Sequence, residues 1–451
     1  MRNKKTVNLK YSIFLMIFIL IQPILDLSTS LSMYLLDTSL TPGIIIRMLI
    51  IFINSLFIIY ACKYKENRKF LFFLIITAIF FIIHFIINMQ LKPVFSLFAE
   101  ASNIAKVVYL IVMLFAFIIA FKDLREHNLL NKYFPSNVFI ASLIINVVMV
   151  LASITGTGIL SYDALDKFGH SGWFFAANEL STLLAIILPI ILWVTTRNRE
   201  GYKVLIFWLA SILTIGSLTI IGTKAGYLAV VGSLVVLIDA LILERYLHNN
   251  KRGTLLNLMI AVLILCIYIG STKMLPVYIN TNVQYEITRE DQSLPDTNDT
   301  DDTPEEVDTP ETTEPTVEDV VYSGRDGFID MHSEYFKDAP LIQKIFGMGY
   351  AGNYEDNPII IERDFHDLFY QFGYLGFALI FLPIIYYAIR TLITGLFSMS
   401  QLLSLKYLML LSSTALGFGI AFIAGHTLVA PAVSTYLALV IGFIIVNLKI
   451  E

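Results

Sequence analysis

Charged residues are scarce in this 451-residue chain: Asp, Glu, Lys and Arg together make up only 15% of it. Soluble domains are about 25% charged and about 45–50% apolar, whereas 57% of this chain is hydrophobic. This composition excludes an ordinary soluble enzyme. Apolar runs of about 20 residues recur, and each can cross about 30 Å of hydrocarbon as a helix. The short alternating strands of a membrane barrel are missing.

Cysteine is also scarce, since Cys62 and Cys266 lie far apart, inside or at the end of apolar runs. We therefore expect neither a disulfide nor a cysteine-based metal site. The sequence has no HExxH or CxxC spacing, and no Walker or dinucleotide-binding motif between the apolar runs. We expect no metal and no cofactor at this chain, and no nucleic-acid partner.

The apolar runs predict an all-α polytopic membrane protein with about twelve transmembrane helices and a large extracellular loop that carries short helices. Lys and Arg concentrate in segments such as KYKENRK (63–69) and ERYLHNNKR (244–252). By the positive-inside rule, these segments and both termini are cytoplasmic. The expected spans are residues 11–27, 44–62, 70–88, 103–121, 137–155, 173–196, 204–221, 225–243, 254–273, 367–389, 406–424 and 427–447.

The large loop divides the chain into four parts. Residues 1–273 are expected to hold transmembrane helices 1–9, and residues 367–451 helices 10–12. Residues 274–320 are rich in acids and poor in apolar residues, so we expect a disordered extracellular spacer. Residues 321–366 regain aromatic and apolar side chains and are expected to form an ordered cap of two short helices.

Two cations in the outer half of the protein point to an anion. Lys224 follows a Gly-Thr break between two apolar runs, so its ammonium is expected at the outer end of a tight helical hairpin. Arg325 stands where the loop enters a helix expected over residues 326–337, which Pro340 would end. A guanidinium at a helix N-terminus suits phosphate. For Lys224 the ordinary alternative is a lysine that snorkels to the membrane interface.

His366 stands in IIIERDFHDLFYQFGYLG (359–376), directly before an apolar run. Asp364 and Asp367 flank it in the sequence. A neighbouring carboxylate can orient an imidazole and raise its basicity, which suits a general base that takes a proton from a hydroxyl. His366 is therefore the candidate catalytic residue.

Other polar residues of the outer half are supporting candidates, because charged groups near membrane spans are costly and often functional. Glu179 requires a cationic partner, which Lys224, Arg47 or Lys106 could supply, and a structural ion pair between helices is the alternative to a functional role. Together with Asp364 and Asp367, the supporting candidates are Arg363, Asn178, Glu179, Arg47, Lys106 and His426.

Five stretches, in this order, resemble the O-antigen ligase and O-antigen polymerase superfamily of bacterial cell-surface glycan enzymes. They are GWFFAANEL (172–180), GTKAG (222–226), SGRDGF (323–328), FGMGY (346–350) and DFHDLFYQFGYLG (364–376). The resemblance runs from about residue 137 to 447. It implies a metal-independent glycosyltransferase of the bacterial cytoplasmic membrane. Such enzymes take a glycan from undecaprenyl diphosphate at the outer face and transfer it to an acceptor hydroxyl.

Carried over by position, the resemblance implies that Lys224 and Arg325 hold the diphosphate and that His366 activates the acceptor hydroxyl. Lys224 departs from the pattern, since many members carry Arg there; Lys keeps the charge but loses the bidentate fork. We favour a polymerase that extends a repeat-unit polysaccharide. A ligase that moves the finished glycan to a lipid, wall polymer or protein is an open alternative. A lipid-linked glycan flippase or transporter is the alternative from another class, although no internal repeat is visible.

Overall fold

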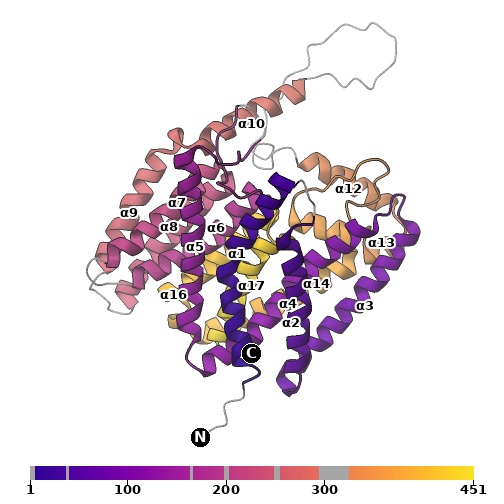
Figure 1. The fold of residues 1–451 in the computed structure, drawn as a ribbon, viewed down its shortest axis with the longest axis horizontal. Helices are drawn as coiled ribbons and strands as arrows, with labels where there is room; N and C mark the ends of the chain where they lie inside the picture. Colours follow the sequence, from indigo (N-terminus) through magenta and orange to yellow (C-terminus); the bar gives the residue numbers. More distant parts are fainter. Residues whose placement is uncertain are drawn as a thin grey trace.

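The computed structural model describes residues 6–36, 40–162, 166–197, 203–247, 254–293 and 325–450 (Figure 1). Most of these residues lie in helices. In chain order the elements are α1 (Leu9–Leu36), α2 (Pro42–Ala61), η1 (Lys65–Asn67), α3 (Arg68–Leu91), α4 (Leu97–Glu126), α5 (Leu130–Thr155), α6 (Ala177–Arg197), α7 (Lys203–Ile221), α8 (Lys224–Leu247), α9 (Thr254–Gly270), η2 (Thr272–Met274), α10 (Pro276–Ser293), α12 (Asp326–Asp338), α13 (Leu341–Phe346), α14 (Asp364–Phe397), α15 (Met399–Leu402), α16 (Leu405–Ile423) and α17 (Pro431–Asn447).

The predicted all-α polytopic fold is confirmed. Ten helices in the described part of the chain are long and apolar enough to cross a membrane, and α9 and α17 are shorter apolar helices of 17 residues each. Each of the twelve expected spans corresponds to one of these helices. The clearest differences are at the helix ends, because α1 continues to Leu36 and α14 begins at Asp364 and continues to Phe397.

Helices α4, α6 and α17 form the centre of the bundle, and α6 is buried along nearly its whole length. The Tyr109 and Thr435 hydroxyls are 2.7 Å apart and join α4 to α17. On the same two helices and α5, the rings of Phe121, Phe134 and Phe443 stack or meet edge to face. The outer helices, such as α2 and α3, instead expose rows of Ile, Leu and Phe, as lipid-facing helices do.

Helices α10, α12 and α13 lie at one end of the bundle, opposite the start of α1 and the end of α17 (Figure 1). The two short helices expected in the cap are therefore present, as α12 and α13. We use "cap" for residues 325–362, which follow the undescribed segment and precede α14. Residues 294–324, which include most of the expected spacer and the first residues of the expected cap, lie outside the described residues.

The first part of the expected disordered spacer is helical, which corrects the prediction for residues 276–293. Helix α10 is attached by Asn280, whose side chain accepts a hydrogen bond from the Phe168 amide (2.7 Å) and donates to the carbonyl oxygens of Phe168 (2.7 Å) and Gly222 (3.0 Å). Lys167 also donates to Gln284 Oε1 (2.7 Å). These side-chain bonds to two loops hold a helix that composition alone does not favour.

The cap is interlocked with a kink in α14. Helical geometry breaks at Gly373 (φ 65°, ψ −173°), which frees carbonyl oxygens on the preceding turn. The amides of Met348 and Gly349 donate to the carbonyl oxygens of Tyr370 (3.1 Å) and Gln371 (2.9 Å). The Gly-x-Gly turn after α13 thus satisfies the backbone groups that the kink exposes.

Glycine is required on both sides of this contact. A Cβ added at Gly347 would lie 2.1 Å from the Gln371 carbonyl oxygen, and one added at Gly373 would lie 2.5 Å from the Gly347 amide nitrogen. The His84 ring of α3 supports the same turn, because its Nδ1 lies 2.7 Å from the Phe346 carbonyl oxygen. The buried His84 side chain therefore has a hydrogen-bond partner in the cap.

A buried ion pair holds the far end of the turn. Lys92 Nζ lies 2.5 Å from Glu100 Oε1 and also bonds the Tyr350 carbonyl oxygen, while the Tyr350 amide donates to Glu100 Oε2 (2.9 Å). Both charged side chains are almost fully buried. The loop between α3 and α4 and the start of α4 thus form part of the surface on which the cap packs.

Candidate functional site

Two ion pairs dock the N-terminus of α12 against the residues that precede α14. Arg325 donates to Glu362 Oε2 from Nη2 (2.9 Å) and Nε (3.3 Å). Arg363 Nη1 lies 3.2 Å from Asp326 Oδ1. Two adjacent residues at the start of α12 therefore pair with two adjacent residues directly before α14, and this contact brings Arg325 close to the helical turn that carries His366.

Phe422, near the end of α16, lies next to both Arg363 and His366. The Arg363 guanidinium lies over the Phe422 ring (5.4 Å to the centroid), and its Nε donates to the Phe422 carbonyl oxygen (3.1 Å). The His366 ring lies 6.1 Å from the Phe422 ring between centroids. The His366 imidazole is half-buried, and its Nδ1 is buried with no hydrogen-bond partner among the described residues.

The expectation that Asp364 orients His366 is wrong. Asp364 Oδ2 accepts from the amides of Thr427 (2.9 Å) and Leu428 (2.6 Å). Successive residues of a helix are turned by about 100°, so two residues apart they point to nearly opposite faces. Asp364 is buried and holds the loop between α16 and α17.

Asp367 does not orient His366 either. Its carboxylate accepts from the amides of Ile361 (3.0 Å) and Arg363 (3.2 Å), and Gln371 Nε2 lies 3.3 Å from it. This buried carboxylate caps the backbone at the start of α14. The two acids position the segments around the imidazole without contacting it.

His426 lies on the loop between α16 and α17 and faces the cap. Its Nε2 is 3.9 Å from Glu362 Oε2, an ion-pair distance that is too long for a hydrogen bond. Burial alone would lower the pKa of His426, but the carboxylates of Glu362, Glu179 and Asp364 outweigh it and raise the pKa above its usual value. His426, with Arg325, lowers the pKa of Glu362 to about 2 despite burial.

Lys224 is the first residue of α8, directly after the break at Gly222 and Thr223, as the sequence predicted. Lys167 and Arg325 lie within electrostatic range of its ammonium. Burial lowers the pKa of Lys167, whose side chain also reaches the Tyr162 ring (5.3 Å from Nζ to the centroid). Three cations from three segments therefore converge near the N-terminus of α12.

A cavity of about 900 Å³ lies between α1, α2, α4 and α6. Its walls are mostly apolar, and its charged lining residues are Asp26, Arg47, Lys106 and Glu179. Arg47 forms an ion pair with Asp26 and donates to Gln22 Oε1 (3.0 Å).

The sequence predicted the cations near Glu179 only in part. Glu179 forms no ion pair within 4 Å with any described residue, although His426, Arg47 and Lys106 act on it electrostatically. Lys224, the other expected partner, is not among the charges that do so. Asn178 is exposed and is not among the residues that line the cavity.

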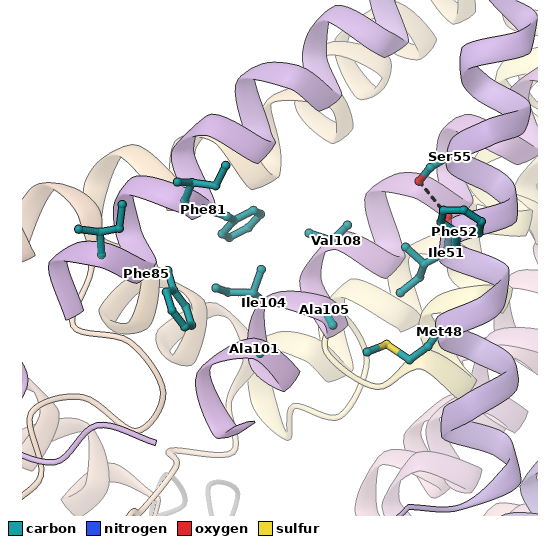
Figure 2. Close-up of a pocket in the computed structure, with 12 residues that line it drawn as sticks. Met48, Ile51, Phe52, Ser55, Phe81, Phe85, Ala101, Ile104, Ala105 and Val108 are labelled. Carbon is teal, nitrogen blue, oxygen red and sulfur yellow. Dashed lines mark hydrogen bonds between the residues drawn. The ribbon is translucent and has the colours of Figure 1, made fainter. Parts of the chain in front are cut away.

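A second hollow, of about 610 Å³, lies between α2, α3 and α4 and is almost entirely apolar (Figure 2). Figure 2 shows Phe81 and Phe85 of α3 facing Met48 and Phe52 of α2 across it. The two hollows share four of their lining residues, Met48, Ile51, Ala101 and Ala105. The two spaces are therefore neighbours, separated by the facing surfaces of α2 and α4.

Sequence reasoning missed Glu362, Asp326 and Lys167. A signal for the first two was present, because the order Arg-Asp at 325–326 complements the order Glu-Arg at 362–363. Lys167 had no such signal, since its place near Lys224 depends on the fold of the loop between α5 and α6. Among the described residues, no group of three or more His, Cys, Asp or Glu side chains is arranged to hold a metal ion.

The comparisons with known proteins agree with this architecture. No curated protein matches the sequence. Residues 8–451, nearly the whole chain, match the family described as "O-antigen ligase like membrane protein". The chain therefore belongs to the family of O-antigen ligase like membrane proteins.

Proposed function

We propose that this protein transfers a glycan from undecaprenyl diphosphate to an acceptor hydroxyl and thereby polymerises the repeat units of a bacterial surface polysaccharide. Family membership supports a glycan ligase or polymerase and implies a glycosyl-transferring enzyme. The observation that carries the proposal is the convergence of Arg325, Lys224 and His366 at one end of the bundle, through the docking of α12 on the start of α14.

In the proposed step, the acceptor oxygen attacks the anomeric carbon of the donor glycan and gives its proton to His366. The bond between that carbon and the diphosphate oxygen breaks, and the diphosphate leaves with the electron pair. Arg325 and Lys224 stabilise the charge that develops on the leaving group. The His366 side chain as a whole is only half-buried, which leaves part of it open to an acceptor hydroxyl.

The two apolar hollows support a lipid-linked donor. A polyprenyl chain requires an apolar surface that begins near the cations and continues toward lipid. The 900 Å³ cavity carries Arg47 and Lys106 on its wall, and the 610 Å³ groove is almost purely apolar. We propose that the lipid tail lies in these spaces while its diphosphate is held at Arg325 and Lys224.

The membrane orientation follows from the positive-inside rule. Lys and Arg concentrate in the loops at the end of the bundle where α1 starts and α17 ends, which favours a cytoplasmic location for that end. The cap, Arg325 and His366 would then face the outside of the bacterial cytoplasmic membrane, where a lipid-linked glycan and a hydroxyl acceptor meet.

The test is replacement of His366 by alanine in cells, with His127→Ala at the other end of the bundle as the matched control. Single repeat units accumulating on the lipid, with long chains lost, would support a polymerase. Long chains accumulating on the lipid, without transfer to a final acceptor, would support the ligase alternative. An unchanged glycan ladder from a well-expressed His366→Ala protein would exclude His366 from the mechanism and favour a flippase.

A further inference from the structure

One carboxylate oxygen in the site faces both a guanidinium and an imidazole. Glu362 Oε2 accepts both hydrogen bonds from Arg325, at 2.9 and 3.3 Å, and the same oxygen lies 3.9 Å from His426 Nε2. The Glu362 side chain is 41% exposed, so a ligand that reaches Arg325 also reaches its counter-ion. Because His426 and Arg325 lower its pKa to about 2, the carboxylate is ionised at any physiological pH.

The backbone at both acidic and basic partners is unusual. Glu362 (φ 60°) and His426 (φ 59°) are in the left-handed region, which is costly for residues with a Cβ. Glycine or asparagine would adopt either left-handed backbone conformation at a lower free-energy cost. Two facing residues held in this conformation indicate that their side chains are needed where they are.

We propose that Glu362 is an exchangeable counter-ion of the diphosphate site, which yields Arg325 to the donor and takes it back to expel the leaving lipid diphosphate. This inference rests on the proposed function. During exchange the carboxylate turns to the His426 imidazole, so it keeps a side-chain partner in its partly buried position. Lys224 remains on the diphosphate throughout, since it lies on another element.

The charges of donor and product explain why such a residue is useful. The donor diphosphate is esterified at both ends and has two ionised oxygens. Transfer of the glycan frees one end, whose further ionisation has a pKa of about 6, so the product is more negative than the donor. Arg325 and Lys224 therefore hold the product more tightly. A carboxylate tethered beside Arg325 competes at a high effective concentration and shortens that residence.

The test uses Glu362→Gln in the purified full-length protein, because glutamine keeps an acceptor for Arg325 and removes only the charge. Farnesyl diphosphate is the probe, and calorimetry in detergent measures its binding. We expect about fivefold tighter binding than in the wild type, because the competing carboxylate no longer occupies Arg325. In turnover assays kcat and KM should both fall, and inhibition by farnesyl diphosphate should strengthen. Glu355→Gln, an exposed acid of the same segment, is the matched control.

The outcomes separate this inference from the proposed function. If Glu362→Gln binds the probe no better than wild type while Arg325→Gln loses it, the counter-ion role is wrong and the diphosphate site stands. If neither wild type nor Glu362→Gln binds the probe, the diphosphate site is wrong and both proposals fail. Tighter binding with an unchanged kcat would contradict the role in product release.

Discussion

Replacement of Gly373 by alanine should separate the cap from the bundle. Gly373 has φ 65° and ψ −173°, a conformation that is essentially restricted to glycine and costs other residues about 1–3 kcal/mol. The added Cβ would also lie 2.5 Å from the Gly347 amide nitrogen and 2.6 Å from the Lys344 carbonyl oxygen. Both are backbone atoms, which cannot rotate away, so the turn after α13 must move.

The expected loss follows from these contacts. Moving the turn breaks the bonds from Met348 and Gly349 to the carbonyl oxygens before the kink, each with a net value of about 1 kcal/mol. With the backbone strain, the free energy of unfolding should fall by about 3–5 kcal/mol. Transfer activity should fall as well, because the same helix carries His366 and the same cap carries Arg325.

The assay is thermal unfolding of the purified protein in detergent at one scan rate, together with the glycan ladder in cells. Gly216→Ala is the matched control, because a Cβ there meets nothing within 4 Å in helix α7. That control should be stabilised by about 0.5–1 kcal/mol. A Gly373→Ala protein with the wild-type unfolding midpoint would refute the reasoning that the kink and the cap require each other.

Three further predictions test the charged groups. Lys92→Met should lower the free energy of unfolding by about 3–5 kcal/mol, because it leaves the buried Glu100 carboxylate uncompensated, and adding Glu100→Leu should restore part of the loss. The folded pKa of His426 is raised, so its pairing with Glu362 stabilises the fold fully below about pH 6.5, and this stabilisation is lost as pH rises through the folded pKa. The difference in melting temperature between wild type and His426→Gln should therefore shrink at alkaline pH. A difference that stays constant with pH would contradict the pairing. Arg325→Lys should retain part of the transfer rate that Arg325→Ala loses, since lysine keeps the charge without the fork; equal rates for the two variants would show that the charge does not act on the reaction.

The transmembrane helices were predictable because an apolar run of sufficient length has one stable form in hydrocarbon, where each backbone group must be satisfied within the segment. Helix α10 was not predictable in this way. It is held by Asn280 and Lys167 bonds to loops that are distant in sequence, and its polar composition resembles that of a spacer. Composition indicates which segments are buried, whereas the position of α10 depends on specific hydrogen bonds to other segments.

For the candidate site, the sequence correctly indicated that Arg325 begins a helix and that Lys224 follows a break between helices. It misled where proximity in sequence was taken for contact: Asp364 and Asp367 flank His366 along the chain, yet the helix turns them toward other partners. The roles of Arg325, Lys224 and His366 stay predictions until they are measured.

The paired charges at residues 325–326 and 362–363 also determine the register in which the start of α12 docks on the segment before α14. Arg325 meets Glu362, and Asp326 meets Arg363. A slip by one residue in one direction would set Arg325 against Arg363, and a slip in the other direction would set Asp326 against Glu362. Each misalignment opposes like charges and is therefore disfavoured relative to the observed pairing. The four charges therefore fix the position of the Arg325 guanidinium through contacts made by the two segments themselves.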